Sequence, residues 1–156
     1  MKRYIYIIVA LCLLNFSCAT VLADTGEVQP PEIVGKAGIV MDVLTGKVLY
    51  EKNAHMQLEP ASTTKIMTAI LALERGNLSD TVVTSKEPPR VDGSRIYLEE
   101  GEELTLEQML YGMMLNSGND AAVAIAEHIG GSVESFVKMM NAKAREIGAY
   151  NTSYVN

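Results

Sequence analysis

The chain has 156 residues, with 13 Lys and Arg against 19 Asp and Glu and a formal net charge of −6. This length has room for one modest domain, and the acidic balance argues against binding to nucleic acid or broad attraction to anionic lipid. Both cysteines, Cys12 and Cys18, lie close to the N-terminus. The rest of the chain therefore has no disulfide, no thiol nucleophile and no sulfur ligand for a metal.

Residues 1–23 are typical of a secretory signal peptide. Lys2 and Arg3 form its charged start, and the apolar run from Tyr4 to Leu14 is too short to span a membrane comfortably. We expect cleavage after Ala23, with the position after Ala19 as a second candidate. An uncleaved membrane anchor is the alternative, which the break in the run at residue 15 disfavours. The chain is therefore expected to be extracytoplasmic, either secreted or in a bacterial cell envelope.

The front of the exported part predicts a β-hairpin. After an extended lead-in over residues 24–36, the β-rich runs 37–43 and 47–51 are separated by Leu44-Thr45-Gly46. Because a lone two-stranded hairpin is marginal in water, these strands are expected to need partners from elsewhere.

The remainder predicts mainly helices. The first begins near Ser62 and stops at Gly76; its predicted apolar stripe is Ile66, Ala69, Ile70 and Leu73. A short strand is expected at 81–84, and residues 85–101 are interpreted mainly as loop. A capping box at Thr105–Gln108 opens a helix, whose predicted core residues are Leu106, Met109, Leu110, Met113 and Met114.

Two further helices follow. Asp120 is predicted to cap a helix over 121–129, which ends at a pair of glycines. Ser132 is then predicted to cap a helix that ends at Gly148. Its expected buried stripe is Val133, Phe136, Val137, Met140, Ala144 and Ile147. The pattern as a whole predicts a mostly helical layer with a small piece of sheet at its front.

The stretch from Ser62 to Lys65 carries a possible chemistry. Residues three apart on a helix are neighbours, so Ser62 and Lys65 could share a proton. The helix start would ease an alkoxide at Ser62, and burial would favour the neutral, basic form of Lys65. A weak nucleophile beside its own base is the minimum apparatus for acyl transfer through a covalent ester. The alternative is that the hydroxyls in this stretch only cap the helix.

A second candidate group, Ser117-Gly118-Asn119, lies between two helices that are expected to be buried. A loop held by two rigid helices is a good mount for reactive groups. Ser117 could pass a proton between Lys65 and a leaving group, and Asn119 could hold a substrate amide or the Lys65 ammonium. The alternative is an ordinary polar loop that ends in an Asp cap. A second Ser-x-x-Lys, at Ser135 and Lys138, is expected mid-helix on a polar face, with no helix end to activate it.

Ser-x-x-Lys at a helix start followed by Ser-x-Asn in an interhelix loop resembles the active-serine penicillin-recognising enzymes. With glycine between Ser117 and Asn119, the chain is similar to the low-molecular-mass D-Ala-D-Ala carboxypeptidases over about residues 35–156. The resemblance implies an α/β (α+β) fold of the β-lactamase/DD-peptidase type, in which helices flank an antiparallel sheet. This chain would hold most of one helical layer and the first hairpin, and would therefore be mostly helical.

By that resemblance, Ser62 attacks the carbonyl between the two D-alanines of a peptidoglycan stem peptide and Lys65 takes its proton. D-Alanine leaves with help from Ser117, Asn119 contacts the substrate, and water hydrolyses the acyl-enzyme. β-Lactam antibiotics would act as inhibitors. No metal or organic cofactor is implied. The alternatives are a class A β-lactamase and a non-catalytic cell-wall-binding protein of the same fold.

One element of the family pattern is missing from the chain. Its third motif, Lys-Thr-Gly or a close variant, lies on a later strand, but the only lysines after Asn119 are Lys138 and Lys143, and Thr-Gly follows neither. Residues 24–156 are therefore expected to be the N-terminal part of a catalytic domain, without the later strand, the C-terminal domain or a membrane-associating tail. We expect the chain alone to fold poorly and to be inactive or nearly so. Membrane association is expected only through the signal segment or such a tail.

Overall fold

The computed structural model describes residues 29–155, which fall into two units, one ending at Gln57 and the other beginning at Leu58. The predicted signal peptide, residues 1–23, lies outside the described residues. Within the described range, no helix combines the length and the apolar character that crossing a membrane requires.

The first unit contains the predicted hairpin. Strand β1 (Gly38–Met41) pairs antiparallel with β2 (Val48–Lys52), and Val40 lies opposite Tyr50. Ile39 and Val40 point to opposite faces of this two-stranded sheet, and their side chains are 51% and 52% exposed. Apolar surface is thus open on both faces, which fits the expectation that the hairpin needs further partners.

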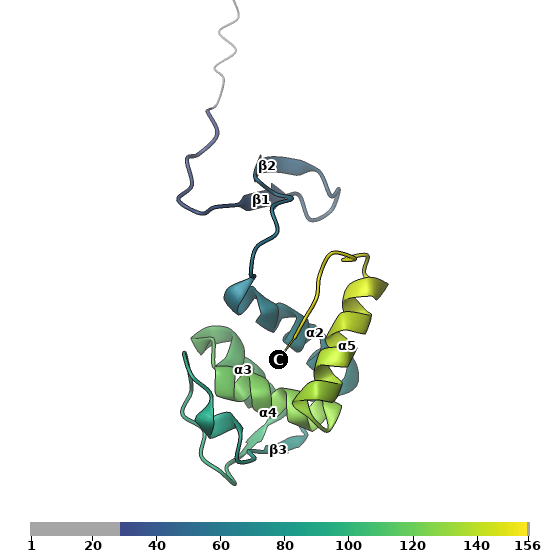
Figure 1. Cartoon of the computed structure of the whole chain (residues 1–156). Coiled ribbons are helices and arrows are strands. Elements are labelled where there is room, and N and C mark those ends of the chain that lie inside the picture. The colour runs from purple at the N-terminus through teal and green to yellow at the C-terminus, as the bar shows by residue number, and fades with distance from the viewer. Residues whose placement is uncertain (1–28, 156) are drawn as a thin grey trace, which may run out of the picture. The chain divides into compact units, whose positions relative to one another are not determined.

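The second unit is built around four helices, α2 (Thr64–Arg75), α3 (Leu106–Asn116), α4 (Asn119–Gly130) and α5 (Val133–Glu146), which Figure 1 shows gathered together. Helix α4 is central, because its contacts with the other three helices are the most extensive. A short 3₁₀ turn, η1 (Ala61–Thr63), leads into α2, and another, η2 (Pro88–Arg90), lies on α4.

A small second sheet borders these helices. Strand β3 (Thr81–Val83), which is the predicted short strand, pairs antiparallel with β4 (Glu103–Thr105), and Val82 lies opposite Leu104. Strand β4 was not predicted, since three residues are too few to show the alternation that marks a strand. The structural outcome is a mixed α/β arrangement that is mostly helical and has small antiparallel sheets.

Both predicted side-chain caps of helices α3 and α5 are present. Thr105 Oγ1 accepts a hydrogen bond from the backbone N–H of Gln108 at 3.2 Å, and Gln108 Oε1 accepts one from the N–H of Thr105 at 2.9 Å, which confirms the capping box of α3. Ser132 Oγ accepts from the N–H of Ser135 at 3.1 Å and caps α5. Satisfying these first-turn amides fixes where the two helices begin.

The core lies where α4 meets its neighbours, and three of the predicted stripes needed correction. On α2 the buried residues are Met67, Thr68, Leu71 and Ala72, whereas Ile66 and Leu73 are 52% and 60% exposed. Helix α2 is apolar on more than one flank, so its periodicity alone does not select the flank that α4 covers. On α3, Met109 and Met113 are fully buried as predicted, but Met114 is 49% exposed. At the end of α5, Ile147 is 57% exposed and does not belong to the buried stripe.

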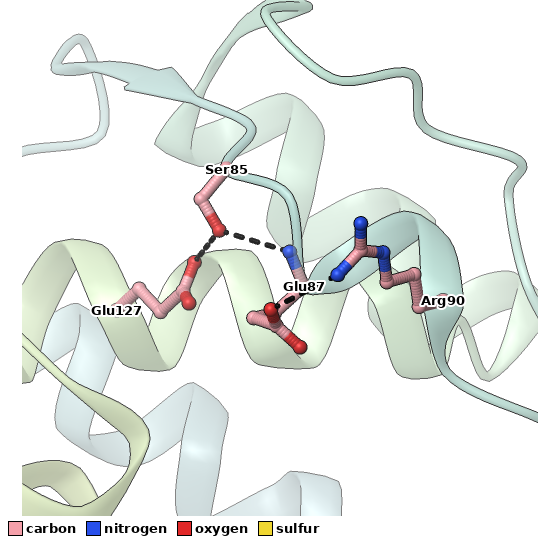
Figure 2. Close-up of polar contacts among 4 residues, drawn as sticks. All are labelled: Ser85, Glu87, Arg90 and Glu127. Carbon is pink, nitrogen blue, oxygen red and sulfur yellow. Dashed lines mark hydrogen bonds and ion pairs between the residues drawn. The ribbon is translucent and has the colours of Figure 1, made fainter.

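The residues between Ser85 and Leu98, here called the 85–98 segment, form a loop as predicted, interrupted only by η2. Figure 2 shows how its first part is attached to α4: Ser85 Oγ donates a hydrogen bond to Glu127 Oε2 at 2.7 Å and accepts one from the N–H of Glu87 at 3.2 Å. Arg90 and Glu87 form an exposed ion pair at 3.5 Å, which contributes little to stability. This attachment joins the beginning of the loop to the C-terminal half of α4.

Candidate active site

Ser62 lies in the 3₁₀ turn η1, immediately before α2 and not inside it as predicted. The capping alternative is wrong for this stretch: no side chain caps η1 or α2, and the Thr63 hydroxyl instead donates to the carbonyl of Pro60 at 2.6 Å. Ala61, just before the serine, has a φ of +48°, a conformation that costs a non-glycine residue free energy. Ser62 is thus exposed and lies on a strained turn, just before the N-terminus of α2.

Lys65 lies in the first turn of α2 and points towards the loop between α3 and α4. Its Nζ donates to Asn119 Oδ1 at 2.6 Å and to Ser117 Oγ at 3.2 Å. Partial burial lowers the pKa of Lys65 from its ordinary value, because removing an ammonium from water disfavours the charged form. The amine is therefore easier to deprotonate than that of an exposed lysine.

Ser117 connects the lysine to the candidate nucleophile. It follows the last residue of α3 with a left-handed φ of +55°, and its Oγ donates to Ser62 Oγ at 2.8 Å. No direct hydrogen bond joins Lys65 to Ser62 among the described side chains. The direct proton sharing predicted from helical spacing is thus replaced by a row of three groups, with Ser117 in the middle.

Asn119 and Asp120 occupy the first turn of α4, and only the first takes the predicted place. Asn119 begins the helix; its Nδ2 donates to the carbonyl of Asp92 at 2.6 Å, and its backbone N–H donates to the carbonyl of Ser94 at 2.7 Å. The prediction of Asp120 as a helix cap is wrong, since Gly118 is the N-cap residue. The Asp120 carboxylate is instead buried within the second unit, where it accepts backbone hydrogen bonds from the loop.

The four predicted site residues thus lie together within the second unit. Three of them, Ser62, Lys65 and Asn119, line a surface pocket of about 420 Å³, which is completed by Ala61, Thr64, Thr68, Ala122 and Val123. Four non-glycine residues between positions 29 and 155 have a positive φ. One of them, Ala61, lines this pocket, and another, Ser117, is hydrogen-bonded to Ser62. Backbone strain of this kind concentrates at functional sites.

The other candidates lie apart from this cluster. Lys138 of the second Ser-x-x-Lys pairs with Glu134 at 2.8 Å on an exposed face of α5, as expected. The predicted mid-helix position is wrong for Ser135, which lies in the first turn of α5. His128 Nε2 lies 3.6 Å from Asp80 Oδ2. In the part of the chain that the structure describes, no group of three or more His, Cys, Asp or Glu side chains could hold a metal ion.

A nucleophile, an amine with a lowered pKa and a hydroxyl between them are the parts that covalent acyl transfer needs. The D-alanyl-D-alanine carboxypeptidase family model (Peptidase_S11) matches residues 24–156. The chain belongs to this family. The match favours the carboxypeptidase interpretation over a class A β-lactamase and accounts for the resemblance seen in the two motifs.

Curated relatives and solved structures agree with the D-alanyl-D-alanine carboxypeptidase family. The chain is 44% identical to the carboxypeptidase DacF of Bacillus subtilis over 100% of its own length and 42% of that protein. It is 36% identical to DacC of Escherichia coli over 86% of its length and 36% of the relative. The chain therefore spans less than half the length of these relatives.

Two solved structures of family members show the same fold. A carboxypeptidase from Mycobacterium tuberculosis matches with a TM-score of 0.77 and 34% identity, over 84% of this chain and 49% of that one. Penicillin binding protein 5 from Haemophilus influenzae matches with a TM-score of 0.75 and 34% identity, over 83% and 40% of the two chains. The β-lactamase/DD-peptidase-like fold predicted from the sequence is confirmed.

Sequence reasoning missed the backbone groups of this site. Asp92 and Ser94 take part through their main-chain carbonyls, which no side-chain pattern marks. A glycine at 93 is a usable signal, because a Cβ there would lie 2.8 Å from Asn119 Nδ2.

Proposed function

We propose that this chain provides the acylating serine and its proton relay in a D-alanyl-D-alanine carboxypeptidase that works outside the cytoplasm. The substrate is a peptidoglycan stem peptide that ends in D-Ala-D-Ala, and β-lactams react with the same serine. One observation carries the proposal: the row of hydrogen bonds from Lys65 through Ser117 to Ser62, at 3.2 Å and 2.8 Å, beside a pocket. Family membership supports the choice of substrate.

Acylation begins when Lys65 is neutral, a state that its burial favours. The two hydrogen bonds then run towards the amine: Ser62 donates to Ser117, and Ser117 donates to Lys65. As Ser62 Oγ bonds to the carbonyl carbon between the D-alanines, its proton moves to Ser117 and the proton of Ser117 moves to Lys65. Positioned proton transfer of this kind typically contributes about 10²–10⁴-fold to a rate.

Lys65 and Ser117 then pass a proton in the opposite direction, to the leaving group. When the bond between the carbonyl carbon and the amide nitrogen breaks, Ser117 gives its proton to the departing D-alanine amine and takes one back from Lys65. An ester on Ser62 remains, and neutral Lys65 is restored. Water then cleaves the ester, with its proton passing to the leaving Ser62 oxygen, so the enzyme ends unchanged.

Asn119 is placed to contact both Lys65 and the substrate. Its Oδ1 accepts from Lys65 at 2.6 Å, which keeps the amine directed at Ser117. The residue also lines the pocket, where it can contact the amide of the stem peptide. We assign Ser62, Lys65 and Ser117 to the chemistry and Asn119 to binding.

The family's Lys-Thr-Gly motif does not occur after Asn119 in these 156 residues. That motif would bind the substrate carboxylate and supply one donor to the developing oxyanion, and loss of one such donor typically lowers a rate about 10²–10³-fold. We therefore propose that residues 24–156 are the N-terminal part of the catalytic domain and acylate far more slowly alone than within the complete reading frame of the gene.

Fluorescent penicillin tests the assignment. The product of the complete reading frame should be labelled, and digestion should place the label on the peptide that contains Ser62. Ser62→Ala should abolish labelling, whereas Ser135→Ala, the matched change in the second Ser-x-x-Lys, should leave it unchanged. Labelling that survives Ser62→Ala would exclude Ser62 as the nucleophile. A wild type that binds cell wall but never forms an adduct would instead show the non-catalytic wall-binding protein.

A further inference from the structure

The 85–98 segment is fastened to α4 at two separate places. One is the Ser85–Glu127 hydrogen bond near β3, which Figure 2 shows. The other lies at the opposite end of the segment, where the first turn of α4 contacts residues 92–98. At this second place the loop contacts Asn119, so the position of the loop decides what Asn119 can contact.

Asp120 makes the second attachment. Its carboxylate is 0% exposed and accepts hydrogen bonds from the backbone N–H groups of Ile96 and Leu98, each at 3.1 Å. Tyr97, between these two donors, has a φ of +64°, which non-glycine residues rarely adopt. The carboxylate therefore stabilises a backbone shape that the loop would not adopt easily without it.

The loop in turn orients the Asn119 amide. The Asp92 carbonyl accepts from Asn119 Nδ2 at 2.6 Å, and the Ser94 carbonyl accepts from the Asn119 N–H at 2.7 Å. A carbonyl can only accept, so it selects the amide nitrogen of the side chain. The amide oxygen is consequently left facing Lys65, where it accepts at 2.6 Å.

We propose that Asp120 is a positioning residue for the Ser62 site: it fixes residues 92–98 against α4, and their carbonyls hold the Asn119 amide oxygen against the Lys65 amine. Asp120 acts only through Asn119 and touches no reacting atom. The inference rests on the proposed function for its importance to catalysis, but the positioning itself can be measured without catalysis.

Asp120→Asn is the direct test. It keeps the size of the side chain and replaces one accepting oxygen with a donor that cannot pair with a backbone N–H. The readout is the protonation of Lys65, followed by NMR in protein labelled with ¹³Cε-lysine. A hydrogen-bond acceptor favours the charged amine and burial disfavours it. Loss of the Asn119 acceptor should therefore lower the titration midpoint of Lys65 below its value in the wild type.

A purely structural role for Asp120 gives a different result. If the substitution only loosened the first turn of α4, water would enter the pocket and the Lys65 midpoint would rise towards that of the exposed lysines. A rise or an unchanged midpoint in a folded Asp120→Asn protein therefore overturns the proposal.

Gly93→Ala provides a second variant in case Asp120→Asn fails to fold. Gly93 is exposed, has a φ of +87°, and its new Cβ would lie 2.8 Å from Asn119 Nδ2, so the amide must move. Gly101→Ala is the matched control, because Gly101 has a φ of +84° and a Cβ there would meet nothing within 4 Å. Both variants add the same kind of backbone strain, but only Gly93→Ala should lower the Lys65 midpoint. Equal midpoints in the two variants overturn the proposal.

Acylation by fluorescent penicillin supplies the second readout. In the product of the complete reading frame, Asp120→Asn and Gly93→Ala should slow acylation roughly 10–100-fold, as small misplacements of positioned groups do. The Asp120→Asn effect should shrink to within about twofold in an Asn119→Ala background, because coupled residues are not additive; full additivity contradicts the proposal. If the wild type is never acylated, the proposed function fails, while the Lys65 titration still decides the positioning.

Discussion

Ser117 combines a hydroxyl in the proposed relay with a left-handed backbone, and two substitutions separate the effects of these two features. Ser117→Ala and Ser117→Gly both remove the hydroxyl that lies between Lys65 and Ser62. They differ only in backbone freedom at a position whose φ is +55°. Any difference in stability between them therefore measures the cost of the left-handed conformation, and any difference in acylation must have another cause.

The size of the effect follows from the backbone. A left-handed conformation costs a residue with a Cβ about 1–2 kcal/mol, while glycine loses about 0.5–1 kcal/mol more than alanine through the entropy of the unfolded chain. The glycine variant should therefore exceed the alanine variant in free energy of unfolding by about 0.5–1 kcal/mol. In a unit the size of Leu58–Asn156, this corresponds to a difference in Tm of roughly 2–8 °C.

The assays are urea and thermal unfolding followed by circular dichroism, together with acylation by fluorescent penicillin. Ser135 provides a control of opposite sign: it lies in the first turn of α5, where the backbone is helical and glycine should be less stable than alanine by about 0.5–1 kcal/mol. Both Ser117 variants should lose acylation equally, by about 10²-fold or more. An alanine variant as stable as the glycine variant would refute the strain argument. Near wild-type acylation in either one would refute the relay.

Three further predictions concern stability. Because burial lowers the pKa of Lys65, the unfolded chain binds the lysine proton more readily than the folded chain. The free energy of unfolding of the wild type, relative to that of Lys65→Met, should therefore rise as the pH increases from the lowered pKa towards 10.5. A difference that stays flat or falls in urea melts contradicts this. Phe136→Ala should destabilise the second unit by about 3–5 kcal/mol, since the ring is buried in the core, and a loss below 1 kcal/mol would show that the site collapses or is loosely packed. Thr105→Ala removes half of the capping box of α3 and should cost about 1 kcal/mol in the same melts, an effect that Thr105→Ser should largely reverse.

Much of the fold was predictable because its signals are local. The Thr105 and Ser132 caps depend on residues three apart, and the hairpin depends on two short β-rich runs with a turn between them. The buried flank of α2 was not predictable in this way. Ile66 and Leu73 are as apolar as Met67 and Leu71, and only the packing of the other helices, with α5 among them, decides which pair is covered.

At the site, the sequence by itself determined which side chains to consider: Ser62, Lys65, Ser117 and Asn119 stand out because their types and spacings are unusual together. Only the tertiary structure decided how they connect. It placed Ser117 between the lysine and the serine, and it turned Asp120 from a predicted cap into the acceptor for the amides of Ile96 and Leu98. The physical reason is that hydrogen bonds between segments more than twenty residues apart depend on where backbone carbonyls and amides lie in space, and those groups are the same in every residue except proline.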